Sequence, residues 1–523
     1  MAGYGLCTKN EVLLVNKFKK VVALDTIIFY PEHEEALKKL VENPKIERIP
    51  LKYDQLNHEW TLPKDYAIPE HANILIWPSS LPESFKDLTP ELHEKLKTAQ
   101  CWTEAGLRES ISNQNLYNRI KDTDCILTCW TNIQDPVLDQ LIKDGKTKAI
   151  ITWTHEFEHR LNVEKTRKAG IYTNSVPDYG TYSVAELEFD FLMKLIEKNK
   201  KTEKRAETNE DIVIGTLNQL FRHYRKSDVN EKNTRRGSFS HQFHKLGMAQ
   251  EHYSNLQSLD EVIPEKMLMG KNIGILGDAN LGYLENILQN GFQANIHRAS
   301  NISQNAEFYR FISDNEIVVY DSSIIDKVLE DKIKILKGGK AIDIQSLNHY
   351  EEQLRNKTLG IVGLGRIGSR VAEIAKTFGM KIQYTTPQKK DNTHEYTTLS
   401  NIMQTSNIIS VNVPTHKVEN LINNQEIIKI RNGTYLINTS DGNAIDQKAL
   451  TERMQKNEIY AGLDVYKGLP TSQTLHLDNN YKGKIGNRLS NHVLTYRAGW
   501  KTQESIRTKT YKMLGHMIDA LQK

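Results

Sequence analysis

The segment that most constrains the fold is a glycine-rich loop between an apolar stretch and a helical pattern. Gly363, Gly365 and Gly368 follow the stretch TLGIV in the spacing G-x-G-x-x-G and open the pattern SRVAEIAKTFG. In this strand–loop–helix context the glycines allow a tight turn, a close approach of the backbone to a pyrophosphate, and close helix–strand packing. The free N–H groups at the helix start, together with Arg366 and Ile367, would face the phosphates. The loop therefore predicts a Rossmann domain that binds a dinucleotide.

The end of the next expected strand, KIQYT, bears on which dinucleotide binds. An acidic residue usually holds the ribose 2′-hydroxyl at this place. Here Thr385 and Thr386 occupy it, and Lys389 and Lys390 follow. Without a carboxylate to repel a 2′-phosphate, we expect NADP or NAD, with a lean toward NADP. If the lysines are simply solvated, NAD remains the alternative.

A second segment repeats this pattern earlier in the chain. KNIGILGDANLG at 271–282 parallels KTLGIVGLGRIG at 357–368. In the first copy Ala279 replaces the middle glycine, and Asp278 puts a negative charge where a phosphate would lie. We therefore predict two Rossmann-like modules in tandem, of which the first binds no dinucleotide. Chance similarity between two βαβ units is the alternative.

The chain divides into several parts, because 523 residues exceed one core at about 100–200 residues per domain. Apolar strand candidates alternate with helical stretches, which predicts parallel sheets covered by helices. One of the helical stretches, 182–200, is expected to be strongly amphipathic. The expected parts are an α/β domain at 1–200 with an insertion near 53–115, an extended arm or inserted segment at 201–266, the degenerate module at 267–349 and the nucleotide domain at 350–502.

Composition excludes several classes of function. A net charge of +4 over 523 residues favours binding to neither nucleic acid nor membranes. No run approaches the roughly 18 apolar residues that span a bilayer, and the N-terminus lacks a signal peptide's pattern. Cys125 and Cys129 are expected to be core residues rather than a zinc pair. We expect a cytoplasmic protein.

Several segments together resemble the D-isomer-specific 2-hydroxyacid dehydrogenases. They are TNSVPDYGTYSVAELEF, NKTLGIVGLGRIGSRVA, NGTYLINTSDGNAIDQKAL, IYAGLDVYKGLP and LTYRAGWKTQE. The resemblance covers about 120–200 and 350–510. It implies a flavodoxin-like substrate domain at 1–200, a cleft between it and the nucleotide domain, and a homodimer. It also implies that the last helix, 503–523, returns to the first domain.

The resemblance also implies cofactor-binding residues beyond the glycine loop. Val413 and Pro414 match the loop over the adenosine side of the dinucleotide. Thr439 and Ser440 match residues near the nicotinamide. Asp464 matches the acid that contacts the carboxamide.

The family's three catalytic positions are replaced in this chain. Asp441 stands where the family has an arginine for the substrate carboxylate, and Leu469 stands where it has a glutamate. Arg497 stands at the histidine position, unless a shifted register recruits His492. Arginine is a poor general acid because its pKa exceeds about 12, and Asp441 would repel a carboxylate. The two charges could pair with each other, or Asp441 could hold a cationic group and Arg497 an anionic one.

A histidine-rich loop lies in the expected cleft. His155-Glu156-x-x-His159 matches a zinc-protease pattern, but that chemistry needs a helix and a third ligand. The segment follows an expected strand, so we favour a loop that contacts substrate and assign no metal. A surface coincidence is the other alternative. His155, His159, Tyr496 and Tyr182 are candidate replacement proton donors.

These observations predict an NAD(P)-dependent oxidoreductase with a rebuilt active site and a non-standard small-molecule substrate. One alternative is a catalytically inactive sensor or partner protein that binds a dinucleotide. Another is non-redox chemistry in the same cleft, with a metal at His155 and His159.

Overall fold

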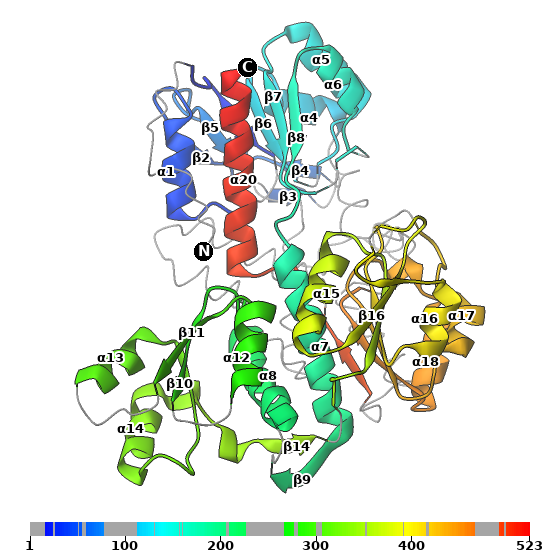
Figure 1. The fold of residues 1–523 in the computed structure, drawn as a ribbon. Helices are drawn as coiled ribbons and strands as arrows, with labels where there is room; N and C mark the ends of the chain where they lie inside the picture. Colours follow the sequence, from blue (N-terminus) through cyan, green and yellow to red (C-terminus); the bar gives the residue numbers. More distant parts are fainter. Residues whose placement is uncertain are drawn as a thin grey trace.

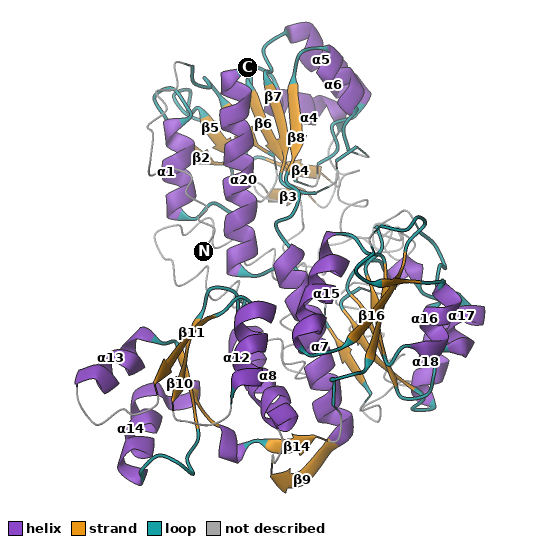
Figure 2. Ribbon diagram, in the orientation of Figure 1, coloured by secondary structure: helices purple, strands orange, loops and turns teal. Residues whose placement is uncertain are grey.

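The computed structural model describes residues 16–24, 27–50, 52–54, 59–77, 112–129, 131–155, 157–158, 160–205, 209–225, 266–276, 281–299, 306–350, 353–390, 392–414, 418–465, 491–495 and 498–523. Over these ranges the chain forms three parallel sheets covered by helices (Figures 1 and 2). The α/β fold expected from the alternating pattern is therefore confirmed.

The first sheet belongs to the N-terminal domain and has six parallel strands in the order β2-β5-β1-β6-β7-β8. The five strands β5-β1-β6-β7-β8 have the relative order 2-1-3-4-5 of flavodoxin-like domains, and β2 adds an edge. The strands are β1 (Val21–Ala23), β2 (Ile46–Arg48), β5 (Ile74–Ile76), β6 (Cys125–Thr128), β7 (Ala149–Thr152) and β8 (Tyr172–Ser175). A separate antiparallel pair is formed by β3 (Lys52–Asp54) and β4 (Glu59–Thr61). Strand β5 lies within 53–115, so part of the predicted insertion is core.

Helices cover both faces of this first sheet. They are α1 (Pro31–Lys39), α4 (Asn113–Ile120), α5 (Asp135–Asp144), α6 (Val163–Lys168) and the last helix α20 (Gln503–Gln522). Figure 1 shows α20, in red, lying along the N-terminal domain, where it contacts α1, β7 and β8. Cys125 and Cys129 are both buried in this domain, and Cys129 Sγ donates to the Trp153 carbonyl at 3.2 Å. They are small core residues.

The nucleotide domain holds a seven-stranded sheet in the order β17-β16-β15-β18-β19-β20-β21. Its strands are β15 (Thr358–Val362), β16 (Lys381–Thr385), β17 (Glu395–Tyr396), β18 (Ile408–Val411), β19 (Thr434–Asn438), β20 (Ile459–Leu463) and β21 (His492–Leu494). Its helices are α15 (Arg366–Thr377), α16 (Leu399–Thr405), α17 (Asn424–Lys429), α18 (Gln447–Gln455) and the short 3₁₀ turn η5 (Gly442–Ala444). The strand order reverses direction between β15 and β18, and ligands of such sheets bind outside the carboxyl ends of the strands at this switch point.

The module before it has a smaller parallel sheet in the order β11-β10-β12-β13. Its strands are β10 (Asn272–Leu276), β11 (Asn295–Ala299), β12 (Ile317–Tyr320) and β13 (Ala341–Asp343). Its helices are α12 (Gly282–Asn286), η2 (Ile287–Gly291), α13 (Ala306–Asp314), α14 (Lys327–Lys337), η3 (Gly338–Lys340) and η4 (Ile344–Ser346). The relative order 2-1-3-4 is the same as that of β16-β15-β18-β19. The common topology supports the predicted repeat, which stays a prediction.

Helix α7 (Thr181–Lys200) lies between the module and the nucleotide domain in Figure 1. Every residue from Ser183 to Ile196 is buried. The predicted amphipathic helix is therefore wrong in one respect, because α7 has no solvated face over this stretch. Its second face is covered by α8 (Asn209–Arg225) and by the module.

Helix α8 corrects part of the predicted extended arm at 201–266. Its apolar residues recur at helical spacing, and five of them, Val213, Leu217, Leu220, Phe221 and Tyr224, are at most 2% exposed. The charged flanks of this stretch obscured the helical period in the sequence. Residues 201–205 of the predicted arm form a strand, and 206–208 and 226–265 lie outside the described residues.

The module and the nucleotide domain share one hydrophobic core, in which residues of α7, α8, β10, η2, α15 and β15 pack together. Four phenylalanines mark the junction. Phe189 of α7 stacks on Phe378 at 5.3 Å between ring centroids, and Phe292 meets Phe189 edge-on at 5.9 Å. Phe221 of α8 completes the group at 5.6 Å from Phe292.

A short antiparallel pair closes the segment between α7 and β15. Strand β9 (Lys201–Arg205) follows α7 directly and pairs with β14 (Asn348–Tyr350), with Arg205 opposite Asn348 and Lys201 opposite Tyr350. The module therefore leaves and rejoins the rest of the chain at one place. None of the helices in the described ranges is long and apolar enough to cross a membrane.

We expect the substitution Phe292→Ala to lower the free energy of unfolding by about 3–5 kcal/mol, because it removes a buried ring from the shared core. Urea unfolding followed by circular dichroism would measure this. The module and the nucleotide domain should unfold in one transition. The control is Tyr309→Ala, since Tyr309 is 47% exposed and should cost less than about 0.5 kcal/mol. Separate transitions for the two parts would contradict the shared core.

Candidate functional site

Two glycines of the loop after β15 have no room for a side chain. A Cβ on Gly363 would lie 2.2 Å from the Asn412 carbonyl oxygen, and Gly363 has a φ of +100°. A Cβ on Gly368 would lie 2.2 Å from the Gly363 carbonyl oxygen. These contacts are the tight turn and the close helix–strand packing that the glycine spacing predicts.

The middle glycine differs from its neighbours. Gly365 is the N-cap of α15, has a φ of −88°, and a Cβ there would meet nothing within 4 Å. Its side is open, and the first N–H groups of α15 have no intrahelical acceptor. An open backbone at a helix N-terminus fits a pyrophosphate. Gly282, which matches Gly368 in the earlier copy, would meet no described atom within 4 Å, and residues 277–280 of the earlier loop lie outside the described residues.

The predicted phosphate-facing arginine has an internal partner. Arg366 is exposed and forms an ion pair with Asp178, which lies just before α7. Ile367, beside it, is half-buried. A bound pyrophosphate would therefore compete with Asp178 for this guanidinium group.

The end of β16 is polar and carries no carboxylate. Thr385 and Thr386 are half-buried, and the Thr386 hydroxyl donates to the Gln388 carbonyl at 2.6 Å. Lys389 and Lys390 are exposed. This side of the loop is open to a ribose with either a hydroxyl or a phosphate at its 2′ position.

Four residues implied by the family resemblance line the carboxyl ends of β18 and β19. Val413 is buried and Pro414 is exposed after β18, and Thr439 and Ser440 are half-buried after β19. Because neighbouring parallel strands end at the same edge, these residues and the glycine loop share the switch-point edge of the sheet.

A buried carboxyl group at this edge was not predicted from the sequence. Glu188 of α7 is 2% exposed and accepts hydrogen bonds from Ser410 of β18 and, at 2.8 Å, from the Thr439 hydroxyl. Asn412 donates to the Ser410 hydroxyl at 2.6 Å and extends this network toward Gly363. Burial raises the pKa of Glu188 to about 7. No acid of α7 was among the predicted site residues, because the helix was expected to be amphipathic.

Both predicted aspartates make structural hydrogen bonds. Asp441 is 5% exposed and caps η5 by accepting from the Asn443 N–H at 2.9 Å. Asp464 accepts from the Thr495 hydroxyl at 2.6 Å and from the backbone N–H groups of Ala498 and Gly499 at 2.7 and 3.1 Å. Asp464 therefore holds the segment that leads from β21 to α20.

The proton-donor candidates within the described ranges lie in different parts of the fold. His155 is exposed, and its carbonyl accepts from the Ser175 hydroxyl at 3.4 Å. Tyr182 is 37% exposed and lies under the Arg370 guanidinium group, and His492 of β21 is half-buried. His159, Leu469, Tyr496 and Arg497 lie outside the described residues. Among the described ranges, no cluster of three or more His, Cys, Asp or Glu side chains could hold a metal.

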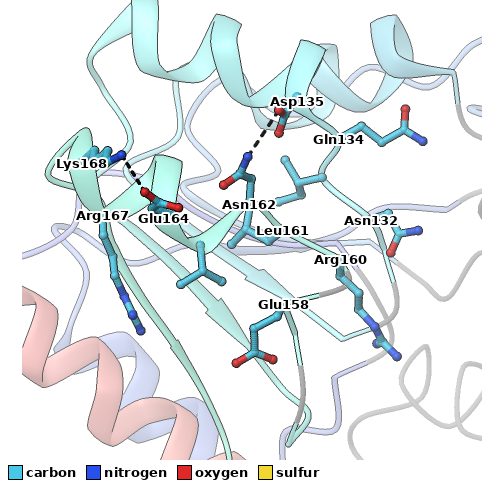
Figure 3. A pocket seen from close by; sticks show the side chains of 12 residues that line it. Asn132, Gln134, Asp135, Glu158, Arg160, Leu161, Asn162, Glu164, Arg167 and Lys168 are labelled. Carbon is cyan, nitrogen blue, oxygen red and sulfur yellow. Dashed lines mark hydrogen bonds and ion pairs between the residues drawn. The ribbon is translucent and has the colours of Figure 1, made fainter. Parts of the chain in front are cut away.

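A cavity of about 890 Å³ lies elsewhere, in the N-terminal domain (Figure 3). Residues of the loops after β6 and β7, with the first turns of α5 and α6, line it. Its charged side chains include Glu158, Arg160, Glu164 and Arg167. None of the predicted site residues is among them. Its mixed charges select no ligand, so the loop after β15 remains the better candidate site.

Comparisons with known proteins agree with this choice. Residues 327–482 match the model of the D-isomer specific 2-hydroxyacid dehydrogenase, NAD binding domain. The hydroxypyruvate reductase of Thermotoga maritima is 39% identical over 137 residues, which are 24% of this chain and 45% of that protein. The glyoxylate reductase of Aeropyrum pernix is 39% identical over 125 residues, which are 23% of this chain and 37% of that protein. The matches thus span less than half of each relative. The resemblance to the family is confirmed over the residues that the family model matches, 327–482.

Solved structures align with most of the chain, but at low sequence identity and low TM-score. The D-lactate dehydrogenase of Aquifex aeolicus, solved with NAD and lactic acid, gives a TM-score of 0.43 at 18% identity, covering 94% of this chain and 93% of that one. This similarity is too low to bear on the site.

We expect Gly363→Ala and Gly368→Ala each to destabilise the protein by at least about 2 kcal/mol, because either methyl group would overlap a backbone oxygen. Gly365→Ala should change stability by less than about 1 kcal/mol, since its φ suits alanine and the space is open. Thermal unfolding monitored by circular dichroism would measure all three. Equal losses at the three positions would show that the loop is not built as described.

Proposed function

We propose that the protein is an NAD(P)-dependent oxidoreductase, because residues 327–482 match the model of the D-isomer specific 2-hydroxyacid dehydrogenase, NAD binding domain. The observation that carries the proposal is the glycine loop. Gly363 and Gly368 are sterically required to be glycine, whereas Gly365 leaves an open face at the N-terminus of α15. This combination fits a pyrophosphate. A bound nicotinamide would exchange a hydride with a small-molecule substrate.

We propose that NADP binds at least as well as NAD. Thr385 and Thr386 offer hydroxyl groups where a carboxylate would select the 2′-hydroxyl of NAD. Lys389 and Lys390, three and four residues after Thr386, are exposed and would attract a 2′-phosphate. The expected cytoplasmic location and homodimer stay predictions.

We further propose that the substrate differs from a simple 2-oxo acid. The names of the two relatives specify hydroxypyruvate and glyoxylate, both of which carry a carboxylate. In this chain Asp441 stands where the family's arginine would hold that group, and its carboxylate caps η5. A carboxylate there repels another carboxylate. An aldehyde, or an imine with a cationic group, would avoid this repulsion.

A second candidate function is dinucleotide binding without turnover. It is favoured by Asp464, whose two oxygens already accept three hydrogen bonds from residues 495–499. The residue expected to contact the carboxamide is thus occupied in holding the start of α20. Such a protein would bind a dinucleotide and oxidise or reduce nothing.

We expect Gly365→Ala to weaken binding of NADH and NADPH at least tenfold, or by about 1.4 kcal/mol, because the added methyl group would occupy the pyrophosphate's approach. Titrations of tryptophan fluorescence would measure the dissociation constants. Gly282→Ala is the matched control, because it adds the same group at an open glycine of the other module and should leave binding unchanged. The proposal fails if the wild-type protein binds neither dinucleotide.

We expect NADPH oxidation, followed at 340 nm, with aldehydes or imines and at least tenfold slower oxidation with 2-oxo acids such as glyoxylate. The reason is the repulsion at Asp441. Rapid turnover of 2-oxo acids would overturn the altered substrate class. Tight dinucleotide binding without turnover of any compound in the panel would favour the second candidate function.

A further inference from the structure

The network around Glu188 connects a buried carboxyl group to the edge of the sheet where a dinucleotide is proposed to bind. Glu188 is 2% exposed, whereas Thr439, which donates to it at 2.8 Å, is half-buried. The Thr439 hydroxyl group therefore lies between the Glu188 carboxyl group and the switch-point edge of the nucleotide sheet. Ser410 donates to the other carboxyl oxygen from within β18.

Among the described residues, no charged side chain contributes to the shift in the pKa of Glu188. Burial raises the pKa of this carboxyl to about 7, and the donors Ser410, Thr439 and Asn412 only partly oppose the shift. The buried cations on and around α7 bind other groups. Arg370 pairs with Glu373 and donates to the Gly291 carbonyl. Lys194 pairs with Asp190, and Arg225 donates to Ser183. On β21, His492 is half-buried. Glu188 is thus poised to change its protonation near neutral pH.

A second glutamate of the same helix provides an internal comparison. Burial also raises the pKa of Glu186 to about 7, and this residue is 3% exposed. Its oxygens accept from the backbone N–H groups of Leu268 and Met269, on the side of the module. The two carboxyl groups share a helix and a degree of burial, and they differ in that only Glu188 reaches the proposed cofactor edge.

We propose that Glu188 holds the exchangeable proton of the cofactor cleft and passes it through the hydroxyl group of Thr439. This inference rests on the proposed dinucleotide binding. It assigns a proton-holding group to a site whose family positions carry Asp441 and Arg497 in place of arginine and histidine. Glu188 would touch neither cofactor nor substrate and would act through Thr439.

The proton balance of this arrangement is simple. The chemistry that a bound nicotinamide would supply is hydride transfer to a carbonyl carbon, and the carbonyl oxygen would then need one proton from the protein. The Thr439 hydroxyl gives its proton to that oxygen and receives the proton of Glu188. Glu188 is left as a carboxylate, and Thr439 then donates to it in the sense seen in the structure. One proton has moved from the buried carboxyl to the cleft.

The same arrangement couples the protonation of Glu188 to the charge of the cofactor. The oxidised nicotinamide ring carries a positive charge and the reduced ring does not. A nearby positive charge favours the ionised carboxyl. Binding of an oxidised dinucleotide near pH 7 should therefore release protons, and binding of the reduced form should not.

The test is proton release on mixing the protein with NAD or NADP, measured by stopped-flow with an indicator dye in weakly buffered solution. We expect release of about 0.2–0.5 proton per bound oxidised dinucleotide at pH 7, and none on binding of the reduced form. Glu188→Gln should abolish the release. Glu186→Gln should retain it, because Glu186 faces the module.

Variants of Thr439 test the path of the proton independently of the charge at Glu188. Thr439→Val should slow the release at least tenfold, since it removes the hydroxyl group but keeps the carboxyl. Thr439→Ser should restore the rate. This pair also keeps the inference testable if Glu188→Gln does not fold.

The outcomes separate the two proposals. If fluorescence titration shows that no dinucleotide binds, the proposed function fails and this inference fails with it. If a dinucleotide binds but proton release is absent, or is the same in Glu188→Gln, the inference alone is overturned. Equal release rates for Thr439→Val and Thr439→Ser would overturn the role of the hydroxyl group.

Discussion

The complete burial of α7 is the constraint on which the rest of the structure depends. Fourteen consecutive residues, Ser183–Ile196, are buried, so apolar surface must cover the helix on both faces. The nucleotide sheet covers one face of α7. There the backbone of Gly462 lies directly against the Phe191 side chain, since a Cβ on Gly462 would lie 2.8 Å from it. Helix α8 and the module supply the other face. The same enclosure forces each acid of the helix to find a partner, because a buried charge without one is costly.

The sequence predicted the parts of the fold that depend on local pattern. After a strand, the spacing of Gly363, Gly365 and Gly368 predicts a tight turn and close helix–strand packing. The structure agrees, because a Cβ on Gly363 or Gly368 would collide with a backbone oxygen. Burial of α7 and of Glu188 depends instead on α8 and the module, which lie later in the chain. Three acids at 186, 188 and 190 within an apolar run break any amphipathic stripe. That irregularity was the available sign that the helix has no solvated side.

The two parallel sheets around α7 show how little of a dinucleotide-binding fold is specific to binding. Strands β11-β10-β12-β13 and β16-β15-β18-β19 have the same relative order, and both pack into one core. The glycines that open the first helix of each module have different surroundings among the described residues. Gly368 lies against a backbone oxygen, whereas Gly282 lies against nothing within 4 Å. Topology is set by packing, and function by a site placed on it.

The pairing of β9 with β14 has a consequence for how this architecture could have arisen. Because the two ends of the intervening segment meet in one antiparallel pair, a chain without the segment would need only a short connection from α7 to β15. Joining neighbouring ends adds little loop-closure entropy, so a coding sequence could be gained here in a single event without rerouting the chain. Losing the segment would affect the protein differently from gaining it. Because α8 and the module cover the second face of α7, deletion of the segment would expose that face to water, so the present chain depends on the segment for its stability.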